Sequence, residues 1–381
     1  QAVGIPQGSV LSGLLCNFFF GHIEEKLLGE ILTTPVHPAR EFNAPVTITS
    51  GENDSTSKSQ SRLFPDPEGD CTLLRQVDDF LLVSTSKRKA EAFVRIMHDQ
   101  VKTGEWGFGV HEGKTAVNFD MSVDGDPGTQ YLQRVRKIDG KMFPWCGLRF
   151  NTQTCEVMAN YSRYSHSSIS DSVTVESHRA GACLMAKMKR FLSPKCHALM
   201  LDEGELGINS RHTVLLNVYE MFLVCAAKTA ASALRLPRGP AGNSSLLSQG
   251  AQETTGYAYN LIQRCSNKRR GDFGTSKGVR CVCKVNRFEV TWLGLYAFQQ
   301  VFSVYSAKRK GFARPTSDVA DALLGVEGGE KRRETSHGIG GGAYRSTAEK
   351  SKEGRRVEAV ARLRRIVRKS DALRLLHTLT T

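Results

Sequence analysis

The sequence lacks the features that mark a secreted or membrane-spanning protein. Its ten cysteines have no paired spacing, and several lie inside apolar helical runs, so we expect no disulfide framework but the reduced core thiols of an intracellular protein. No apolar run approaches the roughly 20 residues of a membrane span. No signal peptide precedes Gln1. The chain also lacks an initiator Met, and a motif begins at its third or fourth residue, so we expect a truncated polypeptide.

A metal-binding cysteine cluster is also not expected. Cys281 and Cys283 are separated by one residue, and Cys265 precedes them among Lys and Arg residues. A one-residue gap fits zinc poorly, and no His lies close by. The sequence therefore predicts no structural zinc.

What the chain does have is length, apolar residues and positive charge. Its 381 residues are 40% hydrophobic, which supports two or three domains with cores and excludes disorder throughout. Lys and Arg number 52 against 38 Asp and Glu, giving a net charge of +14. Such a charge favours a polyanionic partner. Charge alone leaves an ordinary soluble basic protein as an equal alternative.

Periodicity predicts a mixed first part and a helical second part, with a domain boundary near 152. A buried amphipathic helix is predicted over 9–30 with Ser9 as its N-cap, followed by a loop or insertion over 34–70. One more helix is predicted over 87–102. The helices expected beyond residue 180 cover 182–201, 211–236, about 252–265 and 288–305.

The C-terminal part differs in composition. The segment 307–355 is charged and contains a Gly-rich run, which predicts a flexible linker. A basic helix is predicted within 356–381, with Val357, Val360, Leu363 and Val367 along one side. Its arginines suit RNA, DNA or nuclear import equally.

Two adjacent carboxylates carry the first chemical signal. Asp78 and Asp79 join two short apolar strands, 73–77 and 80–83, and so lie at the tip of a predicted hairpin. Phosphoryl transfer to a primer hydroxyl uses two divalent metals about 4 Å apart, which carboxylates hold. Taken alone, a solvated Asp-Asp turn explains the pair better than a metal site does, since Asp is a common turn residue.

A second signal precedes the first helix. The segment 4–9 reads Gly-Ile-Pro-Gln-Gly-Ser and stands directly before the helical pattern. Its Gly permits close backbone approach, its Gln amide offers hydrogen bonds, and the helix N-terminus is positive. Such a turn can hold a nucleotide against its template base. An ordinary Pro-Gly turn with a Ser cap is the alternative.

Four segments in order resemble successive motifs of reverse transcriptases. They are 4–9 (Gly-Ile-Pro-Gln-Gly-Ser), 77–83 (Val-Asp-Asp-Phe-Leu-Leu-Val), 113–119 (Gly-Lys-Thr-Ala-Val-Asn-Phe) and 145–148 (Trp-Cys-Gly-Leu). The residue sequences of the second and fourth segments are similar to those of the telomerase reverse transcriptase family. The run 188–202 and the Asn-Val-Tyr at 217–219 resemble that family's thumb. The chain resembles this family from residue 1 to about 230, and less closely over 288–305.

The resemblance implies a fold and an activity. The fold would be α+β. Residues 1–152 would form part of a right-hand polymerase palm, which is a mixed sheet with flanking helices, and residues 153–306 would form an all-α thumb. The implied activity is RNA-templated addition of deoxynucleotide repeats to chromosome 3′ ends. The resemblance implies telomerase RNA, a telomeric single-stranded DNA primer and dNTPs as partners, and no membrane. It also implies Mg²⁺ as the metal and a location in the nucleus at telomeres.

The resemblance also implies residue roles. Asp78 and Asp79 would be catalytic metal ligands, and Lys114 would neutralise the triphosphate or protonate the leaving pyrophosphate. Gln7 and Gly8 would contact the nucleotide. The primer grip would be formed by Trp145, Cys146 and Gly147. Thumb contacts to nucleic-acid phosphates would come from Lys187, Lys189, Arg190 and Lys195.

The resemblance places a third catalytic carboxylate in a motif upstream of Gly4, so we expect this fragment to be inactive by itself.

Two alternatives stay open on the sequence. A mobile-element reverse transcriptase, of the non-LTR or group II intron type, shares the Asp pair and the Gly-Ile-Pro-Gln-Gly turn. A catalytically dead, nucleic-acid-binding remnant is the other alternative.

Overall fold

The computed structural model describes residues 11–33, 70–102, 106–121, 132–174, 180–203, 207–267, 281–328, 347–368 and 372–380. They divide into two compact units, Gln1–Cys146 and Gly147–Thr381. This division lies close to the boundary expected near 152. The expected fold class, α+β with a partial palm and then a helical thumb, is confirmed.

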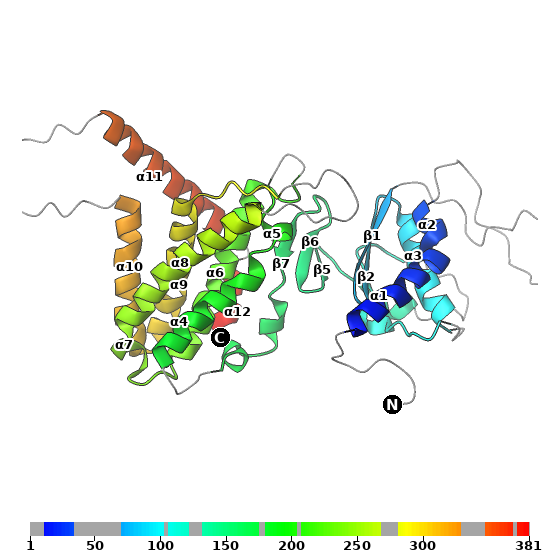
Figure 1. Cartoon of the computed structure of the whole chain (residues 1–381), viewed down its shortest axis with the longest axis horizontal. Coiled ribbons are helices and arrows are strands. Elements are labelled where there is room, and N and C mark those ends of the chain that lie inside the picture. Colours follow the sequence, from blue (N-terminus) through cyan, green and yellow to red (C-terminus); the bar gives the residue numbers. More distant parts are fainter. Residues whose placement is uncertain are drawn as a thin grey trace, which may run out of the picture. The chain divides into compact units, whose positions relative to one another are not determined.

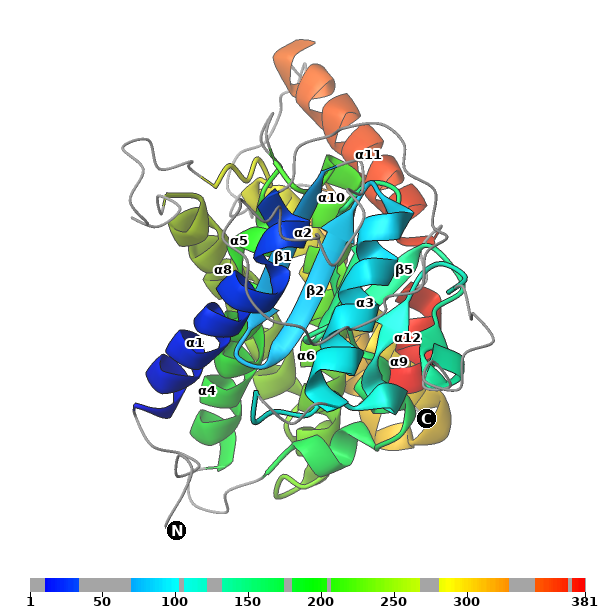
Figure 2. The ribbon, with the colours of Figure 1, turned by 90° about the vertical axis from the view of Figure 1, so that its right-hand side faces the viewer.

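The first unit is built around an antiparallel hairpin with helices beside it. In chain order its elements are α1 (Ser12–Ile23), the π-helix η1 (Glu24–Leu28), α2 (Gly29–Thr33), β1 (Cys71–Gln76), β2 (Asp79–Ser84), α3 (Lys87–Lys102), η2 (Glu112–Lys114), β3 (Ala116–Val117), β4 (Arg136–Lys137) and β5 (Met142–Trp145). Figure 2 shows β1 and β2 between α1 and α3. Strand β3 pairs with β4 in parallel. The helix predicted over 87–102 is confirmed as α3.

The small core of this unit joins the first helices to α3. Leu28, Ile31, Ile96 and Met97 form one buried cluster. An aromatic group extends it, since the Phe20 ring makes edge contacts with Phe80 and Phe108, at centroid distances of 5.5 and 5.8 Å.

The prediction of a buried amphipathic helix is correct for Phe20 and Ile23 of α1 but wrong for most of its other apolar residues. Phe18 is 70% exposed, and Leu14 on the same helix and Leu11 at its N-cap are also exposed. The periodicity is correct, but among the described residues only part of the apolar surface of α1 has a covering partner. Ser9, predicted as the N-cap, lies outside the described residues, as does nearly all of the 34–70 segment.

The second unit is helical from residue 180 onward. Its elements are β6 (Leu148–Asn151), β7 (Val157–Ala159), η4 (Ser162–Ser165), η5 (Ile169–Ser172), α4 (Ala180–Leu192), η6 (Ser193–Lys195), α5 (Ala198–Leu201), α6 (Arg211–Ala233), α7 (Gly239–Gly242), α8 (Ser244–Asn267), α9 (Arg287–Lys308), η7 (Lys310–Phe312), α10 (Ala313–Gly328), α11 (Thr347–Arg368) and α12 (Ala372–Thr380). Strands β6 and β7 pair antiparallel. Helices α4, α6, α8 and α9 pack on one another, with α10 against α9 (Figure 1).

Helix α6 is the centre of this core. Helix α6 is long and apolar enough for a membrane span, but 94% of its most apolar stretch is buried inside the protein. The expectation that no apolar run reaches this length was therefore wrong. The burial identifies α6 as a core helix, because its apolar surface is already covered by α4, α9 and their neighbours.

Two helical expectations differ from the structure. The helix expected over 182–201 is broken into α4 and α5 because Pro194 lies in the first turn of η6 and cannot donate a backbone hydrogen bond to a continuing helix. The linker expected over 307–355 contains α10, whose Val319 and Leu323 are buried in the core. Apolar spacing within α10 outweighs the charge and glycine around it.

The basic C-terminal helix is docked on the same core. It is part of α11, where Val360, Leu363 and Val367 are buried as predicted while Val357 is exposed. Arg362 Nη2 donates to the fully buried Glu289 carboxylate of α9 at 2.7 Å. The segment 356–381 holds a second helix, α12, whose Leu376 and Leu379 also join the core. Part of the Arg cluster thus has a structural task.

A matched pair of glycines tests this packing. A Cβ at Gly294 of α9 would lie 2.5 Å from Thr255 Cγ2 and 3.0 Å from the Phe222 ring, while a Cβ at Gly256 of α8 would meet nothing within 4 Å. Gly294→Ala should lower the free energy of unfolding by about 1–3 kcal/mol through overpacking. Gly256→Ala should raise it by up to about 1 kcal/mol through helix propensity. Urea unfolding of the two variants measures both, and equal midpoints would contradict the α8–α9 packing.

Candidate active site

The predicted hairpin is present, with the two carboxylates at its tip. Gln76 pairs with Asp79 across the strands, so Val77 and Asp78 form a two-residue turn. Both aspartates are exposed. Exposure suits them, because burying two adjacent unpaired carboxylates would be costly, while the apolar strands anchor the turn in the core.

The turn is strained at the residue before the aspartates. Val77 has a φ of 61°, in the left-handed region that β-branched residues rarely enter. Positive φ at only the first central residue is the pattern of a type II′ hairpin turn, which normally carries Gly there. Such a conformation costs about 1–3 kcal/mol and persists where surrounding contacts impose it.

Arg75 supplies those contacts. Its Nη1 donates to the Val77 carbonyl oxygen at 3.0 Å and to Asn17 Oδ1 at 2.9 Å. Its Nε donates to the Glu24 carboxylate, and the side chain is only 16% exposed. One guanidinium therefore fastens the turn to α1 and η1. Sequence reasoning missed this role, although a charged residue inside an apolar strand was its visible signal.

Cys146, the last residue of the first unit, lies against Asp79. Cys146 and Gly147, with φ values of 47° and 74°, form the two-residue turn between β5 and β6, which fits a type I′ turn. Gly suits this position because it adopts positive φ without strain. The Cys146 thiol donates to Asp79 Oδ2 at 3.4 Å, so two motifs 67 residues apart meet. Burial, and then Asp79, raises the pKa of Cys146 to about 12, so the thiol keeps its proton at neutral pH.

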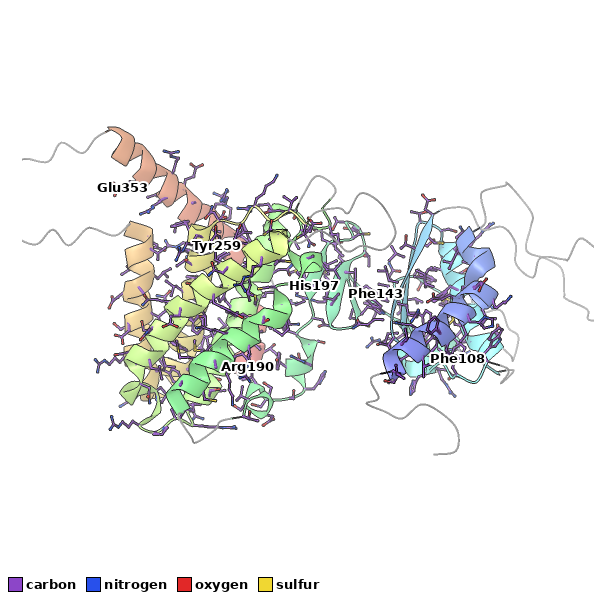
Figure 3. The ribbon with its side chains drawn as sticks, in the orientation of Figure 1. Phe108, Phe143, Arg190, His197, Tyr259 and Glu353 are labelled. Atoms are coloured by element: carbon purple, nitrogen blue, oxygen red, sulfur yellow. The ribbon has the colours of Figure 1, made fainter. Side chains whose placement is uncertain are left out.

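The other predicted residues of this site lie on separate elements. Lys114 ends η2 and is exposed, and the residue after it, Thr115, is held to α3 by a 3.0 Å hydrogen bond with His98 Nε2. Trp145 is half-buried at the end of β5, the strand that carries Phe143 in Figure 3. Gln7 and Gly8 lie outside the described residues. The roles of all these residues remain predictions.

Comparisons with known proteins agree with the motifs. A family model described as "Telomerase reverse transcriptase, C-terminal extension" matches residues 182–317. Telomerase reverse transcriptase of Canis lupus familiaris is 34% identical over 303 residues, 78% of this chain and 22% of the relative. That of Arabidopsis thaliana is 31% identical over 79% of this chain and 25% of the relative, and that of Oryza sativa subsp. japonica is 29% identical over 81% and 22%.

The chain belongs to the telomerase reverse transcriptase family. The resemblance inferred from its motifs is therefore confirmed. The chain spans about a quarter or less of the length of these relatives. The matched C-terminal extension includes the first turn of α10, a segment that sequence reasoning had taken for linker.

The four basic residues predicted for the telomerase thumb differ in their surroundings. Lys187 Nζ donates to Thr174 Oγ1 at 3.2 Å, and Lys189 pairs with Glu253 at 3.5 Å. Arg190 is exposed on α4 (Figure 3). Lys195 lies over the ring of Tyr161, 5.3 Å from its centroid.

Sequence reasoning missed two partners of Lys195. Arg163 of η4 lies 4.9 Å over the Tyr164 ring, and Lys228 of α6 lies 5.0 Å over the Phe191 ring and 5.9 Å over Tyr164. Burial first, and then the charges of Arg163 and Lys228, lower the pKa of Lys195. We call Arg163, Lys195 and Lys228 the basic cluster. No sequence pattern signals it, because its members come from three elements that only folding brings together.

Proposed function

We propose that this chain is part of the catalytic subunit of telomerase, a nuclear enzyme at chromosome ends. In this reaction deoxynucleotides are added to a telomeric DNA 3′ end on an RNA template held as a subunit. The observation that carries the proposal is the Cys146–Asp79 contact at 3.4 Å, in a chain of this family. This contact joins the turn at Asp78, proposed to hold metal, to the turn at Cys146 and Gly147, proposed to hold the primer terminus.

Magnesium fits the donor set. Carboxylate oxygens are the ligands that Mg²⁺ prefers, and Asp78 and Asp79 offer them on an exposed, fastened turn. Within the described residues no group of three metal-ligating side chains occurs, and Mg²⁺ commonly combines one or two carboxylates with waters and substrate phosphates. When bound, the metal ions would lower the pKa of the primer hydroxyl and neutralise the leaving pyrophosphate.

The remaining residues would position the reactants. Arg75 would hold the Val77 carbonyl and so fix the direction of the following carboxylates. The turn at Cys146 and Gly147 would support the primer terminus beside them. Lys114 would offset charge on the triphosphate, and Gln7 and Gly8 would contact the incoming nucleotide.

The basic cluster would bind the phosphates of the RNA–DNA hybrid, together with the exposed Arg190. Burial first, and then repulsion from Arg163 and Lys228, lowers the pKa of Lys195, and an anion among the three cations would offset this repulsion. The aromatic rings beneath hold the cationic groups in place. Lys187 and Lys189 have contacts within the protein and would contribute less.

Primer extension by the complete polypeptide with its RNA subunit tests the proposed function. A telomeric DNA primer with dNTPs and Mg²⁺ should gain repeats, and ribonuclease treatment beforehand should abolish the gain. Extension that survives removal of all RNA would contradict the proposal. No extension under any condition would favour the catalytically dead remnant.

Arg75→Gln should lower the extension rate by about ten- to a hundredfold, because a slightly displaced catalytic group loses that much. Arg75→Lys should lower the extension rate nearly as much. The single ammonium group of a lysine cannot donate to the Val77 carbonyl, Asn17 and Glu24 at the same time, as the guanidinium does. Arg88→Gln is the matched control, because Arg88 is exposed in α3. The rate constant, measured with saturating primer and dNTPs, should fall in the Arg75 variants alone. An unchanged rate would remove the positioning role from Arg75.

A further inference from the structure

Helix α6 carries three buried polar residues on one side of a largely apolar core helix. Thr213, Asn217 and Glu220 are spaced by four and then three residues, so they share one face. Their exposed fractions are only 6, 6 and 2%. Burying a polar side chain is costly unless it has a hydrogen-bond partner. The groups that partner these three residues are therefore held in place against α6.

Two of these side chains hold strand β7. Thr213 Oγ1 donates to Glu156 Oε1 at 3.0 Å, and Asn217 Nδ2 donates to the Val157 carbonyl oxygen at 2.9 Å. Val157 begins β7, and Glu156 directly precedes it. These two contacts therefore fix the end of the β6–β7 hairpin that lies away from Gly147.

The third side chain, Glu220, acts at the Gly147 end of the hairpin. Arg149 of β6 lies two residues after Gly147, and its Nη2 donates to the Glu220 carboxylate at 3.2 Å. Arg149 Nε donates to the Ala159 carbonyl oxygen of β7 at 3.1 Å. The next residue, Asn160, donates its backbone N–H to the Gly147 carbonyl oxygen at 2.8 Å. One guanidinium thus joins β6, β7 and α6 beside Gly147.

We propose that Arg149 and Glu220 are positioning residues for the primer terminus, because their ion pair fixes the turn at Gly147 on α6. The inference rests on the proposed function, in which that turn supports the terminus. A guanidinium donates in a planar fork, so the pair sets the direction of β6 as well as its distance from α6. Nearly all of α6 is buried, which makes it a rigid support.

The burial of the pair allows positioning to be separated from stability. The Arg149 side chain is 25% exposed and that of Glu220 is 2% exposed. A buried carboxylate that loses its cation destabilises a fold, whereas replacing both members of a buried pair by apolar side chains is often neutral. A double replacement therefore keeps the unit folded while it removes the polar link between β6 and α6.

Primer extension by the complete polypeptide with its RNA subunit tests the proposal, with Arg149→Met and the double variant Arg149→Met/Glu220→Met. Both variants should lower kcat/KM for the DNA primer by about ten- to a hundredfold, because a displaced grip misplaces the primer terminus. KM for dNTPs should stay unchanged. Urea unfolding should show a loss of stability in the single variant alone. A double variant with normal stability and normal kcat/KM would make the pair merely structural and overturn the proposal.

Arg364→Met is the matched control. It also removes an arginine from a contact with a glutamate, the 2.7 Å pair between Arg364 of α11 and Glu327 of α10. This variant should leave kcat/KM for the primer unchanged. An equal fall in the control would show that loss of any such ion pair disturbs the primer, which also overturns the specific role of Arg149 and Glu220.

Hydrogen exchange of the 381-residue chain distinguishes this inference from the proposed function. In the double variant the Asn160 amide, which donates to Gly147, should exchange several-fold faster, while amides in the middle of α6 stay protected. Faster exchange there, together with no extension by the unmodified complex, would contradict the proposed function but support the fastening of the turn by the pair. Unchanged exchange at Asn160 would overturn the inference whatever the extension assay shows.

Discussion

Asp78→Asn should abolish primer extension by the complete polypeptide while its RNA subunit stays bound. The amide keeps the shape of the side chain but removes the negative charge that a divalent metal requires. Several kcal/mol of transition-state stabilisation would be lost, which corresponds to about a thousandfold or more in rate. A telomeric primer-extension assay, with RNA retention measured on the same preparation, provides the readout.

Asp139→Asn is the matched control for this change. Asp139 is an exposed carboxylate in the same unit, with only a 3.9 Å pairing to Lys137. Its loss should leave the extension rate and RNA binding unchanged. Extension by the Asp78 variant at the rate of the unmodified protein would remove Asp78 from the active site.

Trp292→Ala should lower the free energy of unfolding of the 381-residue chain by about 3–5 kcal/mol. Trp292 is fully buried in the second turn of α9 and stacks on Tyr296 at a centroid distance of 4.8 Å. Its Nε1 also donates to Glu327 Oε1 of α10 at 2.8 Å. Urea denaturation followed by far-UV circular dichroism measures the loss.

Trp292→Phe separates packing from hydrogen bonding. Phe keeps much of the buried ring area but cannot donate, and Glu327 keeps its 2.7 Å pairing with Arg364. We expect a loss of about 1–2 kcal/mol for this variant. A loss for Trp292→Ala no larger than that for Trp292→Phe would show that Trp292 does not anchor this core.

Local patterns predicted several elements well. Helix α3 agrees with its predicted bounds because its apolar residues recur at helical spacing, and the β1–β2 hairpin was found because two apolar runs flank turn residues. Helix α8 begins at Ser244, well before the predicted 252, because its first turns carry weak apolar spacing. The partial exposure of α1 is a property of tertiary packing that periodicity cannot show.

The residues of the candidate site also divide into those that a local pattern predicted and those that only folding brings together. Asp78 and Asp79 are adjacent in sequence and belong to a motif, so the sequence revealed them. The role of Arg75 depends on Asn17 and Glu24, more than 50 residues away, and the basic cluster depends on three separate elements. Such contacts carry no spacing signal, because folding alone brings their members together.

Under the proposed function, the sequence of the DNA product is dictated by a bound RNA. The most direct measurement is the sequence of the DNA made by the complete polypeptide when the template region of its RNA subunit carries one altered nucleotide. We predict that the complementary change appears in every added repeat. An unchanged repeat, added at the normal rate by the complex that carries the altered RNA, would contradict the account.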